Sequence, residues 1–320
     1  MLRRDFTKTN KDYFNKNKVV LMAVAMFLLL GVLIASIFGF NGNFEMKGCY
    51  QFTVTVEANK SDKYSDYADE ISKIVNSYGG DYDTTSIAGE GDSTQLVVRY
   101  MVDLSGENEV KINLAVAEKL DVASDKISSH SYVSPVVKGT DYVYTAAAIL
   151  LIVLIASIFA FVRYNGASAM AIILGCTLGS LGFMAITAIL RLSVGLSYFA
   201  ILTILNMLII YFAIELFESM HKSSWLANED YAQAMDTAIK ASKFRMLVMS
   251  VAIMLVGVLF IILAPATLKY VSLSIMFMAV VVLAVGWYVM PFVWNVFITR
   301  CKKREYKVKA SNIEDKEEKE

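Results

Sequence analysis

The sequence predicts a helical polytopic membrane protein with one α+β domain inserted after its first membrane span. Two observations support this fold class: 56% of the 320 residues are hydrophobic, and several uncharged runs approach the roughly twenty residues that cross a bilayer. A third is their order, because the mostly polar residues 41–141 separate the first run from all the others. Spanning segments must be helices, since every backbone amide needs a partner inside the lipid.

Six apolar runs are predicted to be transmembrane helices. They are residues 19–40, 144–161, 167–190, 196–217, 246–263 and 271–297. The first run is too long for the apolar part of a signal peptide, and no small-residue cleavage site follows Phe40, so we expect a retained helix. Residues 142–299 then form a five-helix bundle, in which the loop 218–244 joins the fourth and fifth spans of the chain.

Lysines and arginines near the spans predict the orientation of the chain. Residues 1–18 and 300–320 are both rich in these cations, which mark the cytoplasmic side of a membrane protein. Both termini and the loop 218–244 are therefore predicted to be cytoplasmic, and 41–141 extracytoplasmic, with Arg191 as an exception on the outer side. The charged tail is predicted to be disordered. Topology explains these basic runs without nucleic-acid binding.

Residues 41–141 change periodicity in an order that predicts a small α+β domain. Phe52, Val54 and Val56 alternate with polar neighbours, as in a strand. A helix that starts near Tyr67 and ends at Gly79-Gly80 follows, and Ser105 is a plausible N-cap of a second helix. The expected elements are strand 52–56, helix 67–78, strands 84–87 and 95–101, helix 107–120 and strand 127–133. This βαββαβ order is that of ferredoxin-like domains, whose free sheet face is a candidate for binding another chain.

The sequence contains no pattern typical of an enzyme. It has no phosphate-binding glycine loop, no His-Glu-x-x-His and no Gly-x-Ser-x-Gly. Cys49, Cys176 and Cys301 lie too far apart in the predicted topology to form a disulfide or a metal site. His130 and His221 stand alone outside the spans, and we interpret them as solvated. We therefore expect neither catalysis nor a cofactor or metal ion.

Two charged residues within the predicted spans are candidate functional residues, because a charge in lipid costs a few kcal/mol. Glu215 lies about 28 Å along the fourth helix, at about 1.5 Å per residue, and Arg245 begins the fifth. The two helices run in opposite directions, so both charges are expected at the same end of the bundle. One hypothesis is an ion pair that serves an ion relay. In the alternative, each side chain reaches the headgroups separately.

Three glycines and a proline mark helix contacts within the bundle. Gly175 and Gly179 have the spacing that lets helices approach closely, and Gly182 lies one turn further on. They predict packing either inside this bundle or against a partner subunit. Pro291 predicts a kink in the last span rather than a gate.

Several short segments are similar to those of the SecF family, and the resemblance covers nearly the whole chain. Pro135 and the two valines after it, before the second span, resemble the family's Gly-Pro-x-Val, and Phe217-Glu218 resembles the Phe-Asp that ends the fourth span. The other matching segments are Leu202-Thr203-Ile204-Leu205, Ala232-Gln233-Ala234-Met235, Phe244-Arg245-Met246-Leu247-Val248-Met249-Ser250 and Pro291. The chain therefore resembles the smaller half of the bacterial SecD/SecF export unit, in the resistance-nodulation-division (RND) superfamily.

The chain departs from the family at its charged motifs. The family's Asp-Phe-x-Gly-Gly after the first span is matched by Glu45-Met46-Lys47-Gly48-Cys49, which keeps one glycine of two. Cys176-Thr177 stands in place of a His-Asp pair, and the Asn-Asp of the fourth span falls on Ile210-Tyr211 or on Tyr211-Phe212. The resemblance therefore implies a proton relay whose arginine, Arg245, is present but whose carboxylate is not.

The resemblance implies a function, partners and a location. We expect an auxiliary subunit of the Sec protein translocase in the bacterial plasma membrane, which assists late stages of preprotein secretion. Its expected partners are a SecD-like subunit, the SecYEG translocon, preproteins and membrane lipid, with ion coupling either lost or carried by the partner. The alternatives are a half-size lipid or drug exporter of the RND superfamily and a non-conducting structural subunit of the translocon.

Overall fold

The chain forms two compact units in a computed structural model that describes residues 22–57, 70–71, 73–75, 77, 82–88, 93–100, 106–226, 231–263 and 269–298. One unit comprises 42–139 together with 193–196, and the other comprises the remaining residues of the helical bundle. The features predicted at Gly79-Gly80, Ser105 and Cys301, and in both chain ends, lie outside the described residues.

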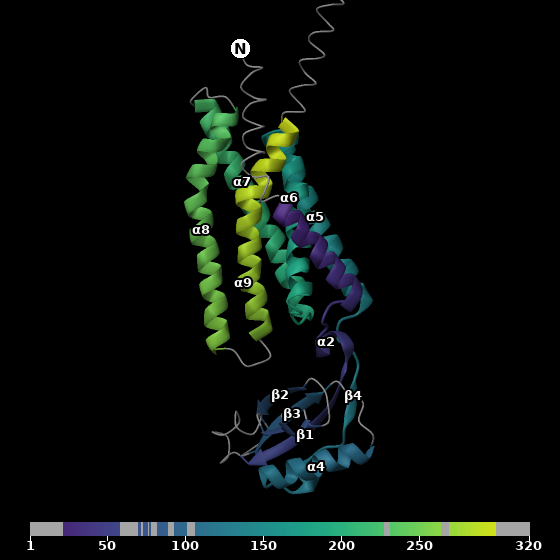
Figure 1. The fold of residues 1–320 in the computed structure, drawn as a ribbon. Helices are drawn as coiled ribbons and strands as arrows, with labels where there is room; N and C mark the ends of the chain where they lie inside the picture. Colours follow the sequence, from purple (N-terminus) through teal and green to yellow (C-terminus); the bar gives the residue numbers. More distant parts are fainter. Residues whose placement is uncertain are drawn as a thin grey trace, which may run out of the picture. The chain divides into compact units, whose positions relative to one another are not determined.

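The helical unit contains five helices long and apolar enough to cross a membrane, counted over the described residues. They are α5 (Gly139–Arg163), α6 (Gly166–Ile189), α7 (Leu196–Leu226), α8 (Tyr231–Leu263) and α9 (Lys269–Ala284), which continues through the π-helical segment η4 (Val285–Val289) to Ile298 (Figure 1). Five predicted apolar spans are thus confirmed as helices of spanning length. The first prediction corresponds to the shorter apolar helix Met22–Phe38.

Helix α8 is longer than predicted, because the loop helix and the fifth span are one element. It runs without a break from Tyr231 to Leu263. The segment has no proline, and its single glycine, Gly257, lies near the far end. Since nothing in the sequence interrupts the helix before Gly257, the amphipathic stretch and the apolar span continue into each other.

The π-helical segment precedes Pro291, which was predicted to kink the last span. Proline has no N–H and its ring clashes with the carbonyl four residues earlier, so regular α-helical bonding cannot continue through it. Directly before it, the Met290 N–H donates to the Val285 carbonyl, five residues back, as in a π turn. The proline therefore coincides with a widened turn of the last span.

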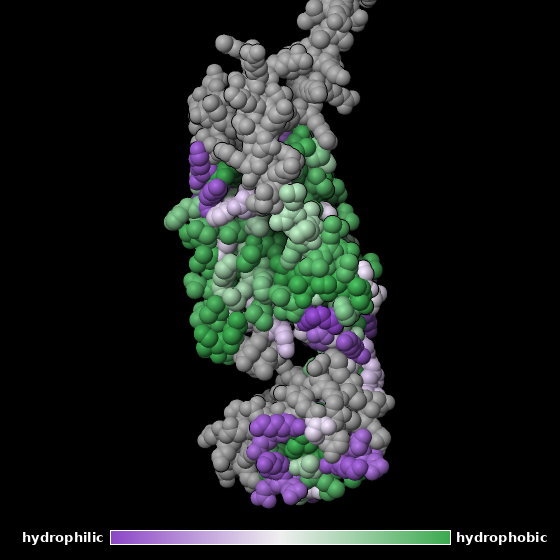
Figure 2. Space-filling view, viewed as in Figure 1, coloured by the Kyte–Doolittle hydropathy of each residue, from purple (hydrophilic) through white to green (hydrophobic). Residues whose placement is uncertain are grey.

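Close contacts between helices show how the helices of this unit are arranged. Gly175, Gly179 and Gly182 of α6 face Met290, Val285 and Val281 in turn, so α6 and the last helix run antiparallel. Helices α5 and α8 lie at the outside, since only 17% of the span window of each is buried, against 44–50% for the others. Figure 2 shows the resulting apolar surface of this unit, which suits lipid contact.

The second unit contains a four-stranded antiparallel sheet. Its elements are α2 (Phe44–Lys47), β1 (Cys49–Glu57), β2 (Tyr82–Ala88), β3 (Ser93–Tyr100), α4 (Gly106–Leu120), the 3-10 turn η2 (Ser124–Lys126) and β4 (Ser131–Val133). The strand order is β2-β3-β1-β4, with antiparallel pairing throughout. Helical residues 70–77 are described in part between β1 and β2.

One face of this sheet packs on helices and forms the core of the unit. Phe52, Val54 and Val56 of β1 are at most 1% exposed. They pack with Ile112, Val116 and Leu120 from one face of α4, and with Ile71 and Val75 (Figure 1). The alternation in β1 therefore places its apolar side chains under α4, as the sequence predicts.

The last strand is shorter than predicted. Residues 124–126 form a 3-10 turn, and only Ser131–Val133 pairs continuously with β1. Between them the Ser128 hydroxyl accepts from the Thr53 N–H at 2.8 Å. The pairing is interrupted rather than absent here, since the Ser128 N–H also donates to the Thr53 carbonyl at 2.8 Å and Ile127 forms an isolated bridge with Val54.

Candidate functional site

Two glutamates on α7 form the centre of the charged site in the helical unit. Glu215 and Glu218 are separated by one helical turn, and α7 has no glycine or proline to disturb that spacing. The Glu215 side chain is 15% exposed and that of Glu218 is 28% exposed. Partly buried carboxylates need positive or hydrogen-bonding partners, and each glutamate finds them on a different helix.

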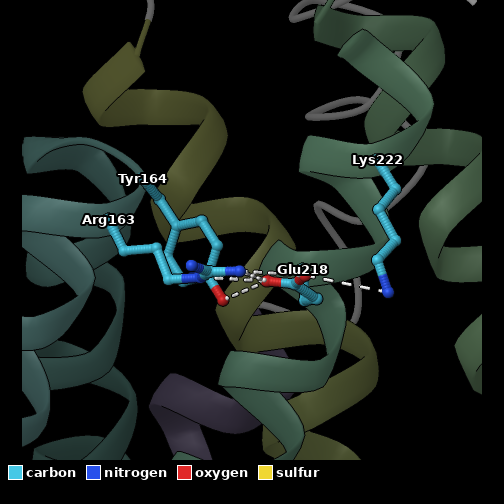
Figure 3. A network of polar contacts seen from close by, with 4 residues as sticks. All are labelled: Arg163, Tyr164, Glu218 and Lys222. Carbon is cyan, nitrogen blue, oxygen red and sulfur yellow. Dashed lines mark hydrogen bonds and ion pairs between the residues drawn. The ribbon is translucent and has the colours of Figure 1, made fainter. Parts of the chain in front are cut away.

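Glu218 is held by three side chains, as Figure 3 shows. Arg163, at the end of α5, donates from Nε and Nη2 to both carboxylate oxygens at 3.0–3.2 Å. The Tyr164 hydroxyl donates to Oε2 at 2.9 Å. Lys222 Nζ, one turn further along α7, lies 3.7 Å from Oε1. The forked contact is the geometry that arginine forms best with a carboxylate.

Glu215 has one charged partner, Arg245 of α8. Arg245 Nε lies 2.8 Å from Glu215 Oε1, and the guanidinium side chain is 62% exposed. Oε1 is nevertheless buried and accepts no hydrogen bond of acceptable geometry from the described residues. We therefore regard the contact as a charge attraction without an aligned hydrogen bond. The structure brings the two predicted charges together, and it leaves Glu215 less well satisfied than Glu218.

A neutral polar pair lies midway along the bundle. Asn206 of α7 is 1% exposed and donates from Nδ2 to Ser180 Oγ of α6 at 2.9 Å. The Ser180 hydroxyl lies 3.2 Å from Asn206 Oδ1, and the amide also donates to the Leu202 carbonyl. The pair joins two helices through groups that do not ionise, so the described middle of this interface holds no charge.

The three predicted packing glycines contact helices of this chain. A Cβ atom on Gly175 would collide with the end of the Met290 side chain, and one on Gly179 with Ile209 of α7. Gly182 has Val281 at 3.9 Å from such an atom. All three thus face the interior of the bundle, where the small side chains allow close helix approach.

Glu45 joins three segments of the sheet-bearing unit. Its carboxylate accepts from the Leu196 N–H, the first residue of α7, at 2.7 Å and from Asn43 Nδ2 at 3.2 Å. Its carbonyl accepts from the Val136 and Val137 N–H groups, both at 2.9 Å, directly after the predicted motif residue Pro135. This motif remnant therefore links the first residue of α7 to the segment that precedes α5.

Gly48 and Arg191 have local structural roles. Gly48 has φ +79°, which suits glycine, and lies against Tyr132 and Val133 of β4. Arg191 donates to the carbonyls of Phe38 and Gly39 at 3.2 and 2.7 Å. It thus caps the end of the helix Met22–Phe38, which explains a cation at a place where the distribution of charges predicted none.

His130 does not stand alone, as the sequence interpretation had it, and it is only partly exposed. Its Nε2 lies 2.9 Å from Asn113 Oδ1, and its Nδ1 is bonded to the Tyr100 hydroxyl. The ring also stacks on Phe52 at 4.5 Å. Burial lowers the pKa of His130 below the usual 6.5, although Glu109 opposes this shift. Packing beneath α4 therefore keeps this imidazole neutral.

The described residues hold no group of three His, Cys, Asp or Glu side chains that could bind a metal ion. Cys49 and Cys176 are both buried, and no disulfide joins them to each other.

Sequence reasoning missed Arg163, Tyr164, Ser180 and Asn206. Arg163 lies just beyond the predicted span 144–161. Only two residues separate it from α6, and this short connection could have indicated that Arg163 lies at the same end of the bundle as Glu218. Asn206 is a lone amide in an apolar run, and an amide in a span is itself a signal of a helix contact.

Comparisons with known proteins identify the fold. Two solved structures of SecDF are similar to this chain, one in a super-membrane-facing form and one from Thermus thermophilus described as a translocon-associated membrane protein. The first has a TM-score of 0.72 at 16% identity and is matched over 92% of this chain. The second has a TM-score of 0.63 at 15% identity, over 90% of this chain. The chain spans only 40% and 38% of their lengths.

No protein-family model and no curated protein matches the sequence. The chain therefore has a SecDF-like fold at low sequence identity.

Proposed function

We propose that the chain is a SecF-like auxiliary subunit of the Sec protein translocase, acting in preprotein export beside a SecD-like partner. The observation that carries the proposal is the SecDF-like fold, matched over 92% of the chain. In addition, the sheet order β2-β3-β1-β4 with α4 on one face is the arrangement expected of a ferredoxin-like domain. The chain spans 40% of the length of that SecDF, and in this proposal the SecD-like partner corresponds to the remainder.

In this proposal the helix Met22–Phe38 belongs to the first of six spans, predicted at residues 19–40, and both termini are cytoplasmic in a bacterial plasma membrane. The capping role of Arg191 supports this orientation, because it gives the outer cation a structural reason. In this proposal the subunit is not an enzyme. A half-size lipid or drug exporter is disfavoured, since one small sheet unit leaves no room for the larger porter region of such proteins.

Affinity isolation of the tagged full chain from its native membranes tests the export role. We expect a SecD-like chain and the SecYEG translocon among the recovered proteins, with an unrelated polytopic protein, tagged in the same way, as the control. Recovery of neither would refute the proposal.

Within this function, Glu215 is the carboxylate best suited to ion coupling. Glu218 has two hydrogen-bonding partners and a nearby lysine, whereas Glu215 has one exposed arginine and a buried oxygen without a hydrogen bond. Export measured for Glu215→Ala, Arg245→Ala and the double variant tests the pair: coupled residues give a double defect smaller than the sum, and additive defects refute it.

A non-conducting structural subunit is the second candidate function. The neutral pair Ser180–Asn206 favours it, because the described centre of the α6–α7 interface offers no titratable group. The two candidates differ in one measurement. If Glu215→Gln leaves export and its dependence on the ion gradient unchanged, then the structural role is preferred.

A further inference from the structure

Helices α5 and α7 are joined at both ends by glutamates. At their starts, Glu45 binds the chain three residues before α5 through its carbonyl and the first N–H of α7 through its carboxylate. At the other end, Glu218 of α7 binds Arg163 and Tyr164 at the end of α5. Both helices run in the same direction between these two points.

A ring contact supports the joint at the starting end. Tyr142 of α5 and Phe199 of α7 have ring centroids 4.9 Å apart in an edge-to-face arrangement. Such pairs add to the free energy of packing beyond the area that they bury. The first turns of the two helices are therefore in contact, as their last turns are.

Few side chains of α5 pack against the rest of the chain. Of its 25 residues only Ala156, Ser157 and Ala160 are buried. Without a large packed interface, the position of a helix depends on its end contacts. The charged and hydrogen-bonded ends thus decide where α5 lies.

There is no space for a further side chain beside the Glu45 carboxylate. Gly195, which precedes α7, could not carry a side chain, because an added Cβ would lie 2.8 Å from Asn43 Cγ and closer still to the Glu45 carboxylate. Asn43 in turn donates its N–H to the Val194 carbonyl at 2.9 Å. Each partner of Glu45 is therefore itself held in place.

We propose that Glu45 and Glu218 clamp α5 to α7 so that the two helices move as one body, with Glu45 as the positioning residue at their start. Glu45 accepts hydrogen bonds from two chain segments at once. Glu218, which belongs to α7, accepts from Arg163 and Tyr164 at the opposite end of α5. The clamp is independent of any ion that the bundle conducts, and it does not rest on the proposed export function.

The distance between spin labels on α5 and α7 tests the clamp. The labels are placed on exposed residues, Leu150 of α5 and Met207 of α7, in the full chain with all three cysteines replaced by alanine and reconstituted in phospholipid vesicles. We expect a single narrow distance distribution. In the double variant Glu45→Ala/Glu218→Ala we expect loss of the narrow peak, with partial broadening in each single variant.

Two controls separate the clamp from general loosening. Glu107→Ala removes an exposed glutamate of α4, which forms a salt bridge to Lys111 of the same helix, and should leave the distribution unchanged. A second label pair, Met207 with Val256 of α8, should keep its distribution in the double variant. If the variant Glu45→Ala/Glu218→Ala does not accumulate, Gly195→Ala combined with Arg163→Gln disturbs the same two contacts by changing the neighbours of Glu45 and Glu218. An unchanged narrow peak in the double variants, or a broad one in the native chain, overturns the proposal.

Discussion

Glu215 and Glu218 lie one turn apart on α7, yet their arginine partners come from helices on different sides, Arg245 of α8 and Arg163 of α5. The same short segment of α7 therefore connects two outer helices of the bundle. The two pairs differ in quality, because the contact to Arg163 is forked and shared with Tyr164, whereas the contact to Arg245 has no aligned hydrogen bond.

Glu218→Gln should lower the stability of the bundle more than Lys222→Gln does. The glutamine loses the forked bond to Arg163, whereas Lys222 is 66% exposed and 3.7 Å away, so water screens its contribution. Unfolding of the full chain in mixed micelles, followed by circular dichroism while the denaturing detergent is increased, measures the difference. Equal unfolding midpoints for the two variants would show that the two-bond contact between Arg163 and Glu218 does not add to stability.

Ser180 and Asn206 should be energetically coupled. Removing either side chain breaks the same hydrogen bond between α6 and α7. Coupling energies of such pairs in membrane proteins average about 0.6 kcal/mol and reach about 1.7 kcal/mol. A double-mutant cycle with Ser180→Ala and Asn206→Ala, measured by the same unfolding assay, gives the value. Thr177→Ala with Thr203→Ala is the matched control with no expected coupling, because each hydroxyl bonds a carbonyl of its own helix.

Alanine at three glycines should destabilise the bundle in a graded series. At Gly31 the added Cβ would lie 2.6 Å from the Ala185 Cα, a backbone atom that cannot move alone. At Gly175 it meets the flexible end of Met290, and at Gly182 it meets Val281 at an ordinary 3.9 Å. Overpacking costs about 1–3 kcal/mol where the neighbour cannot shift. Melting temperatures should therefore fall most for Gly31→Ala and least for Gly182→Ala, and any other order contradicts the packing.

The sequence predicted the elements better than their ends and contacts. Apolar runs identify helices because lipid demands internal hydrogen bonding, and five of them are present as predicted. The union of the loop helix with α8 was missed because a change from amphipathic to apolar composition does not break a helix. The length of β4 was overestimated because Ile127 and Ser128 contact β1 only through an isolated bridge and local bonds, and the continuous ladder begins at Ser131.

The charged site was only half predictable. Glu215 and Arg245 stood out as charges inside apolar runs, and opposite helix directions placed them at one level. Arg163 lies at the boundary of its span, where a cation is ordinary, so composition alone does not mark it. The bonds of Glu45 to Leu196 and Val136 join segments far apart in the sequence, and no local pattern reports such contacts.

The stability of the sheet-bearing unit should decline as the pH falls below about 6.5, the ordinary pKa of histidine. Asn113 Oδ1 can only accept, so Nε2 of His130 carries the proton and Nδ1 accepts from the Tyr100 hydroxyl. Burial lowers the pKa of His130 in the folded state, so the unfolded chain takes up the proton first. Stability is then fully present above 6.5 and is lost progressively as the pH falls towards the folded-state pKa.

Amide exchange of β1 and β4 in the full chain, compared at equal intrinsic exchange across this pH range, measures the loss. His130→Gln should remove this pH dependence while His221→Gln, a change in the helical unit, keeps it. Protection that is independent of pH in the native chain would show that the buried ring does not contribute, since a group whose protonation is the same in both states leaves stability unaffected by pH.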